Sequence, residues 1–291
     1  MKSIFCCLVL GSLLLESCYG QPQEIDAQGG GEDAGISFEL SAGYLIVVKG
    51  RIGSLTNLRF VLDTGATRSV VDRKIVDRLH VSVQGEQHQV FSFDRASSLK
   101  QAKFQDVQFG PVRLANPSML VADLPRFSDF GRDVDALIGM DLLRARNFAI
   151  DYDSRKVSFS PPDRAGSAAV PESDPLFFTL RILIQEHPVH LVVDTGVDGV
   201  LLFEHTLLES VPNLRIEGRT KATSLGRRLR AKWATLPNVS IGAMNGDIRV
   251  LLMKAYPGQI LRGVDGYIGP ASLKARRIEF NFTDRTLTLH K

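Results

Sequence analysis

Cysteine is scarce in this chain of 291 residues, which has only Cys6, Cys7 and Cys18. All three lie in the first 18 residues, so the rest of the chain can form neither a disulfide nor a thiolate metal site. This excludes a small secreted domain stapled by disulfides. The folded part must instead be stabilised by a hydrophobic core, for which an apolar content of 44% is sufficient.

A strong charge of one sign and a long apolar run are also missing. The net charge is +3, from 35 basic and 32 acidic residues, which is too balanced for a nucleic-acid-binding protein. The apolar run from Ile4 to Leu15 is too short to span a bilayer and suits the central region of a secretory signal. The six histidines show no metal-binding spacing, and we expect neither a metal nor a cofactor.

We interpret residues 1–20 as a signal peptide and the polar, glycine-rich residues 21–35 as a flexible tether. The stretch "LESC" ending at Cys18 leaves two processing routes open. One is a lipoprotein signal, with membrane attachment through a lipidated Cys18, although Glu16 is unusual there. The other is ordinary cleavage near Gly20. On either route we expect an exported protein, in a bacterial periplasm or at the cell surface.

The chain contains an internal repeat. Asp-Thr-Gly occurs in "FVLDTGATRSVV", where the aspartate is Asp63, and again in "HLVVDTGVDGVLLF", where it is Asp194. Farther along, residues 136–160 align without a gap with residues 266–290 at an offset of 130. Two copies of this length predict two lobes from a duplicated unit. We place the N-terminal lobe at 36–160, the linker at 161–175 and the C-terminal lobe at 176–291.

Most segments of both copies have the composition of strands. "YLIVVKGRI", "LRFVLD", "LFFTLRILI" and "HLVVD" are rich in β-branched and apolar residues, and the aligned segments end in paired strands around short turns. One helix is expected in each copy. In the first it covers residues 69–80, where Val71, Ile75 and Leu79 recur at helical spacing. Shorter helices are expected at 141–146 and 271–276. The sequence therefore predicts a mainly β fold.

An isolated Asp-Thr-Gly is also an ordinary turn sequence, and we expect it by chance in roughly one chain in twenty of this length. Here, however, each copy follows an apolar strand. Each also precedes an Ile-Gly step, by 76 residues from Asp63 to Gly139 and by 75 from Asp194 to Gly269. The repeated context favours a paired functional site over two unrelated turns.

These motifs resemble the aspartic peptidases of the pepsin and retropepsin type. The resemblance covers both lobes: an Asp-Thr-Gly loop, then two apolar residues and a glycine, Leu137-Ile138-Gly139 and Tyr267-Ile268-Gly269. It implies a two-lobed acid-protease fold with duplicated retropepsin-like β-barrel lobes and a few short helices. It also implies an aspartic endopeptidase that cleaves a peptide or protein substrate with the dyad Asp63 and Asp194. With both lobes in one chain, we expect a pseudo-symmetric monomer.

The resemblance also implies roles for the residues around the dyad. Thr64 and Thr195 would form hydrogen bonds across the lobe interface. Gly65 and Gly196 would let backbone N–H groups approach the carboxylates. Gly139 and Gly269 would let a neighbouring strand pass close to each loop. A covering hairpin, the flap, is expected within residues 83–106, with a partner within 217–237.

The loops also depart from the pepsin pattern. Ala66 and Val197 stand where pepsins have serine or threonine, and pepsin's flap tyrosine has no counterpart. Asp198 matches a retropepsin aspartate and is either a substrate-backbone contact or a turn cap. Two other hypotheses remain open: a catalytically inactive peptide- or envelope-binding protein on the same fold, and a single working lobe that dimerises with its copy.

Overall fold

The structure is a computed structural model. It describes residues 5–6, 35–92, 95–124, 133–159, 167–169, 177–184, 187–204, 211, 214–224, 227–241, 244–254 and 263–290. The predicted signal peptide, tether and linker lie largely outside these residues. Within the signal segment, β1 (Phe5–Cys6) pairs in parallel with a strand of the second repeat. Among the described residues, no helix is both long and apolar enough to cross a membrane.

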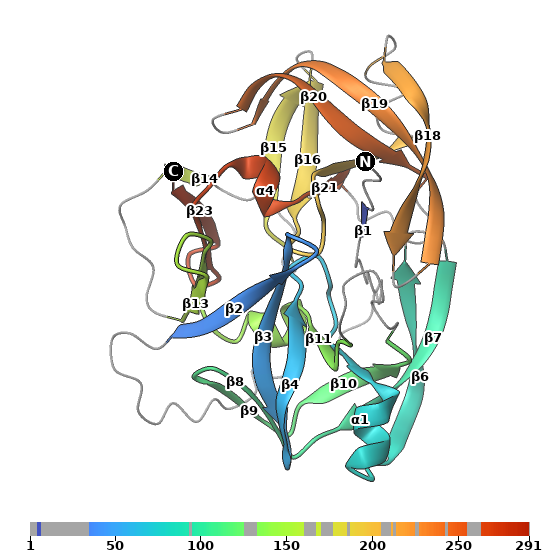
Figure 1. Cartoon of the computed structure of the whole chain (residues 1–291), viewed down its shortest axis with the longest axis vertical. Coiled ribbons are helices and arrows are strands. Elements are labelled where there is room, and N and C mark those ends of the chain that lie inside the picture. Colours follow the sequence, from blue (N-terminus) through green and yellow to red (C-terminus); the bar gives the residue numbers. More distant parts are fainter. Residues whose placement is uncertain are drawn as a thin grey trace.

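The predicted mainly β, two-lobed architecture is confirmed (Figure 1). The described residues of the first repeat form twelve strands. They are β2 (Gly35–Ser41), β3 (Leu45–Ile52), β4 (Leu55–Leu62), β5 (Val70–Asp72), β6 (Val83–Ser92), β7 (Arg95–Lys103), β8 (Asp106–Phe109), β9 (Val112–Ala115), β10 (Ser118–Ala122), β11 (Ala136–Ile138), β12 (Phe148–Asp151) and β13 (Lys156–Ser158). All twelve belong to a 15-stranded sheet.

The second repeat supplies most of an 8-stranded sheet and two strands of the larger one. Its strands are β15 (Thr179–Ile184), β16 (His187–Val193), β17 (Val200–Phe203), β18 (Arg215–Ser224), β19 (Arg227–Ile241), β20 (Met244–Met253), β21 (Gly266–Ile268), β22 (Arg277–Asn281) and β23 (Thr286–His290). Between the repeats, β14 (Ser167–Ala169) pairs with β23. The larger sheet therefore contains strands from both repeats.

A pseudo-two-fold relation joins the repeats where β12 meets β22. These strands occupy aligned positions of the two copies, and they pair with each other in antiparallel register. Phe148 lies opposite Phe280, while Ile150 lies opposite Ile278. The rings of Phe148 and Phe280 stack with centroids 4.7 Å apart. The pairing buries apolar surface of both repeats in one shared core.

The strands that lead to each Asp-Thr-Gly are buried on both faces. In β4, Phe60, Val61 and Leu62 are all at most 1% exposed. A continuous apolar run of this kind is typical of a strand covered on both sides. β4 pairs in parallel with β11, and β16 pairs in parallel with β21 in the same way. The two Asp-Thr-Gly loops thus begin at the ends of rigid, fully buried strands.

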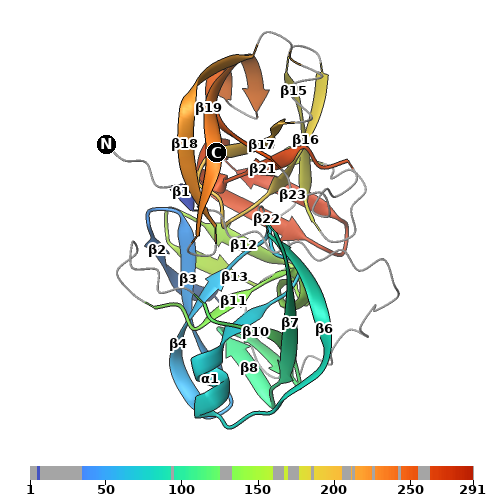
Figure 2. The ribbon, with the colours of Figure 1, turned by 90° about the vertical axis from the view of Figure 1, so that its right-hand side faces the viewer.

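Both expected hairpins are present. β6 and β7 form the first, and β18 and β19 form the second, on the same side of the molecule (Figure 2). Their tips, residues 93–94 and 225–226, lie outside the described residues. In the first hairpin, Val90 and the partly buried Leu99 pack against an apolar cluster that includes Ala66. The first hairpin and the loop that follows Asp63 therefore contribute to the same apolar cluster.

The helix predicted over residues 69–80 is partly wrong. The observed helix α1 covers only Arg73–Arg78, and its N-cap Asp72 accepts a hydrogen bond from the Lys74 N–H at 2.8 Å. Residues 70–72 form β5 instead, between β10 and β11. The counterpart helix in the second copy falls largely on undescribed residues. The expected short helices are α2 (Met140–Leu143) and α4 (Pro270–Leu273).

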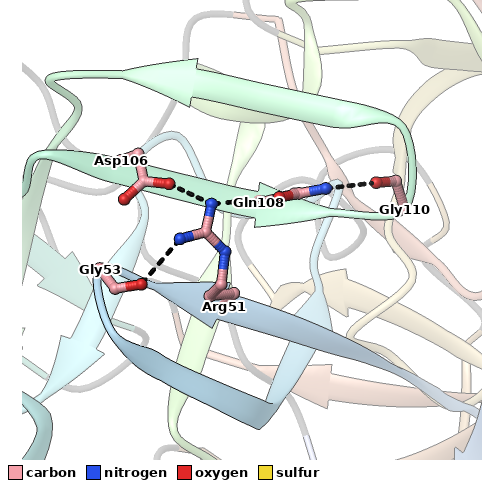
Figure 3. A network of polar contacts seen from close by, with 5 residues as sticks. All are labelled: Arg51, Gly53, Asp106, Gln108 and Gly110. Carbon is pink, nitrogen blue, oxygen red and sulfur yellow. Dashed lines mark hydrogen bonds and ion pairs between the residues drawn. The ribbon is translucent and has the colours of Figure 1, made fainter. Parts of the chain in front are cut away.

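A polar network fastens β3 to β8 (Figure 3). The Arg51 guanidinium forms an ion pair with Asp106 and donates to the Gly53 carbonyl at 2.8 Å and to Gln108 at 3.2 Å. Beside it lies a hollow of about 400 Å³, lined by Arg51, Gly53, Gln105, Asp106, Arg113 and Ala115. Because Asp106 already neutralises Arg51, we assign this hollow no function.

Candidate active site

The structure brings Asp63 and Asp194 together, one from each repeat. Asp63 follows β4 and its N–H donates to the Ile138 carbonyl at 3.0 Å. Asp194 follows β16 and donates to the Ile268 carbonyl at the same distance. Each aspartate is thus fixed by the strand beside it, and both side chains are fully buried.

The two loops are held to each other by their threonines. The Thr64 hydroxyl donates to the Val193 carbonyl at 2.8 Å, and the Thr195 hydroxyl donates to the Leu62 carbonyl at 2.7 Å. Each hydroxyl also accepts the backbone N–H of the opposite threonine at 3.0 Å. These four buried hydrogen bonds form a reciprocal network between the two loops. They set the separation of the loops, because each bond crosses from one repeat to the other.

The two carboxyl groups converge on one point: a Cβ atom built on Gly196 would lie 3.1 Å from both Asp194 Oδ1 and Asp63 Oδ2. On each aspartate, Oδ1 accepts a backbone N–H: from Gly65 at 2.9 Å for Asp63 and from Gly196 at 2.6 Å for Asp194. The Oδ2 atoms have no such donor among the described residues. One proton held between the two groups would relieve the repulsion that two ionised carboxylates would have in this arrangement.

The environment favours protonation of the pair. Burial raises the pKa of Asp63 well above its usual range, and the neighbouring Asp194 carboxylate raises it further. Burial also raises the pKa of Asp194, to about 7, although the Gly196 N–H and the Asp63 side chain oppose the rise. The two groups titrate as a pair, so the apparent pKa values belong to the dyad. The pair can therefore hold one proton over a wide range of pH.

The Ile-Gly steps lie directly against the loops. A Cβ atom on Gly139 would lie 2.8 Å from the carbonyl oxygens of Ala66 and Arg68. On Gly269 it would lie 2.1 Å from the Val197 carbonyl oxygen. Both distances are shorter than van der Waals contact, so only glycine fits at either position. This close approach is the role that the sequence resemblance implied for both glycines.

Comparison with known families gives a match over the first repeat. Residues 48–142, from β3 to α2, match the model of a family described as aspartyl protease. That segment includes Asp63, the loop after it and the Ile138-Gly139 step. A search of curated proteins gives no match.

Comparison with solved structures extends the likeness to both lobes. The aspartic proteinase from Irpex lacteus superposes with a TM-score of 0.51 at 14% sequence identity. The superposition covers 88% of this chain and 96% of the proteinase. The resemblance to aspartic peptidases of the pepsin and retropepsin type is thereby confirmed. The family match and the fold together support a protease-type function.

In this site, Gly65 is the glycine at which a side chain would lie closest to one of the two carboxyl groups. A Cβ there would lie 2.2 Å from Asp194 Cγ, and that carboxyl group is already held by the Gly196 N–H. We expect Gly65→Ala to push the two carboxyl groups apart and to lower kcat by about 100-fold or more. Steady-state kinetics on a cleaved peptide would measure this effect.

Gly196→Ala is the matched comparison, because a Cβ there would come no closer than 3.1 Å to either carboxyl group. Its kcat should fall less than that of Gly65→Ala. Equal losses in the two variants would contradict the steric explanation.

Sequence reasoning missed a polar cluster that supports the first Asp-Thr-Gly loop. Asp141, in the first turn of α2, accepts hydrogen bonds from the N–H and hydroxyl groups of Ser69 and lies beside Arg68. Burial raises the pKa of Asp141, whereas the Ser69 hydrogen bonds and the Arg68 charge oppose that rise. A signal was available, because the aligned position of the second copy is Ala271.

Asp198, predicted as a substrate contact or a turn cap, lies half-buried after the second loop. Burial raises the pKa of its carboxyl group. No hydrogen bond or ion pair joins it to another residue in the part of the chain that the structure describes. Within the same part of the chain, no group of three or more histidine, cysteine, aspartate or glutamate residues could hold a metal ion.

Proposed function

We propose that this protein is an aspartic endopeptidase that hydrolyses peptide bonds with the Asp63/Asp194 dyad. One observation carries the proposal: two fully buried carboxyl groups, one from each lobe, converge on one point. A pair that keeps one proton contains both a general base and a general acid. An ordinary turn aspartate would be solvated and would have no reason to face a second carboxyl group in a buried interface.

The chemistry follows from that single shared proton. The ionised carboxylate takes a proton from a water molecule bound between the two groups, and the resulting hydroxide attacks the carbonyl carbon of the scissile peptide bond. The protonated carboxyl group donates to the carbonyl oxygen. When the tetrahedral intermediate collapses, a proton passes to the leaving amine. The reciprocal threonine hydrogen bonds and the two Gly N–H groups keep the carboxyl groups in this geometry throughout.

We place the substrate between the loops and the two hairpins. Both hairpins lie on the same side of the molecule, at the right of Figure 1 and facing the viewer in Figure 2. The first contributes Val90 and Leu99 to the apolar cluster that contains Ala66. Asp198 is proposed to accept a hydrogen bond from the substrate backbone. Its carboxyl group is half-buried, and the described residues provide no other partner for it.

We further propose that the protein acts as a monomer, because each lobe of the one chain supplies an aspartate. Export to the periplasm or cell surface, with attachment through Cys18 if the lipoprotein route is used, remains a proposal from the sequence of the first 35 residues. We also propose the lobe boundaries that the repeat predicts, 36–160 and 176–291, with a linker at 161–175.

A peptide-library digest between pH 3 and 7 tests the proposal. Mass spectrometry of the products should show cleavage of internal peptide bonds by the wild type. A pepstatin-like transition-state mimic should block that cleavage, because its hydroxyl group takes the place of the attacking water. Binding of peptides without any cleavage across this pH range would favour the inactive binding protein instead.

A further inference from the structure

Side chains of Arg68, Ser69 and Asp141 form a polar cluster that holds the first loop, and we call this cluster the brace. The second loop lacks it. The Ser69 N–H donates to Asp141 Oδ1 at 2.9 Å and the Ser69 hydroxyl donates to the same atom at 2.6 Å. The Asp141 side chain is only 19% exposed. A short hydrogen bond to a largely buried carboxylate is among the stronger polar contacts in a protein.

The same hydroxyl connects Asp141 to the Ile-Gly step. Ser69 Oγ accepts the Gly139 N–H at 2.9 Å while it donates to Asp141. The Met140 N–H also donates to the Ala66 carbonyl at 2.8 Å, so backbone and side-chain bonds run in parallel here. Asp141 therefore fixes the orientation of a hydroxyl group that joins the loop after Asp63 to the strand end beside it.

Arg68 extends the brace toward the first hairpin. Its Nε lies 3.4 Å from Asp141 Oδ2, and its Nη2 donates to Gln101 Oε1 at 3.5 Å. Gln101 belongs to β7, the second strand of that hairpin. Asp141 thus lies at the centre of contacts that reach the Asp63 loop, the Ile-Gly step and the hairpin.

The second lobe has none of these side chains at the matching positions. Gly199 aligns with Arg68, and Ala271 aligns with Asp141. There the Gly269 N–H donates to the Gly199 carbonyl at 2.7 Å, whereas the Gly139 N–H donates to the Ser69 hydroxyl. The side-chain brace is therefore particular to the loop of Asp63 and is not a requirement of the fold.

We infer that Asp141 is a positioning residue for Asp63, acting through Ser69 and Arg68 to hold the first loop, the Ile-Gly step and the first hairpin in register. Asp141 does not touch the reacting atoms. Its effect is on the placement of Asp63 relative to Asp194, and the inference rests on the proposed peptidase function.

Four variants test this role. Asp141→Ala removes the acceptor, and Asp141→Asn keeps an oxygen for Ser69 but loses the charge that faces Arg68. Ser69→Ala removes the connecting hydroxyl, and Ser69→Thr restores it. We expect Asp141→Ala to lower kcat by about 100-fold while KM changes by less than about threefold. Asp141→Asn and Ser69→Thr should recover most of kcat.

Asp135→Ala is the matched control. Asp135 lies in the same lobe, is 15% exposed, accepts the Arg59 N–H at 2.8 Å and forms an ion pair with Lys74 at 3.2 Å. It resembles Asp141 in burial and bonding, but among the described residues its hydrogen bonds and ion pairs go to Arg59, Asp72 and Lys74, outside the loop of residues 63–69. Because Ser69 and Asp141 act as one unit, the double variant Ser69→Ala/Asp141→Ala should lose no more kcat than Asp141→Ala alone. The inference is overturned if Asp141→Ala and Asp135→Ala lower kcat equally, or if the loss falls on KM.

Hydrogen exchange gives a second readout that needs no activity. Amide protons of residues 63–69 and 139–141 should exchange at least about tenfold faster in Asp141→Ala than in Asp135→Ala, with slow exchange restored in Asp141→Asn. Unchanged exchange in Asp141→Ala would overturn the inference. If the wild type cleaves no peptide, the proposed function fails, and the exchange rates still decide whether Asp141 holds the loop.

Discussion

Replacing either Asp63 or Asp194 with asparagine is expected to lower kcat for peptide cleavage by about 10³- to 10⁴-fold. Asparagine keeps the volume of the side chain and an oxygen for the Gly65 or Gly196 N–H, so the loop geometry should survive. It cannot take a proton from water or share one with the opposite carboxyl group. Single-turnover and steady-state kinetics on one peptide from the library digest would measure the loss.

The double variant Asp63→Asn/Asp194→Asn should be no less active than either single variant. The two carboxyl groups act as one unit through a shared proton, so removing one already removes both functions. Asp123→Asn is the control, because that side chain is 84% exposed and pairs with Arg73 on the surface. If Asp194→Asn kept more than about a tenth of the activity, the two-lobe dyad would be wrong. A site made by two copies of the first lobe would then become the better hypothesis.

The paired loops could be predicted from sequence because the chain carries the motif twice. One Asp-Thr-Gly says little, whereas two copies at matching distances from an Ile-Gly step imply a symmetric site. The pairing of Phe148 with Phe280 is the physical counterpart of that symmetry, since aligned strands meet across a pseudo-two-fold axis. The sequence could not show this contact, because pairing between two distant strands leaves no local pattern.

The helix predicted over residues 69–80 is longer than the observed one. Apolar residues at helical spacing indicate buried positions, and these can belong to a strand as well as to a helix. Val70 and Val71 are buried in any arrangement that encloses the loop. In the folded protein they form β5, which pairs with β10 on one side and β11 on the other. Pairing on both sides outweighs helical spacing for these residues, and the helix begins only after the Asp72 cap.

The Asp141 cluster was not predicted, because an alignment of the two copies identifies the residues that they share and not those that differ. The informative difference was Asp141 against Ala271, in a segment that otherwise aligns without a gap. A charged residue in one copy and a small apolar one in the other indicates a contact that only one lobe makes. Its partner, Ser69, lies 72 residues away along the chain, so the structure was needed to identify it.

The cost of burying the dyad should appear in the pH dependence of stability. A carboxyl group whose pKa is higher in the folded protein than in the unfolded chain destabilises the folded protein at every pH at which the unfolded chain ionises that group. For Asp194, with an ordinary pKa of 3.8 and a folded pKa of about 7, the cost is absent below about pH 4. It grows as the pH rises toward 7, because the unfolded state then loses a proton that the folded state keeps.

Asp194→Asn removes this cost, so the variant should be more stable than the wild type at pH 7. The expected difference in the free energy of unfolding is on the order of 2 to 4 kcal/mol at pH 7 and close to zero at pH 4. Urea unfolding at pH 4, 5.5 and 7 would measure it, with Asp123→Asn as an exposed control that should show no such trend. A difference independent of pH would mean that Asp194 is not held protonated in the folded protein. In that case the shared proton, on which the proposed mechanism depends, would have to be abandoned even if peptides were cleaved.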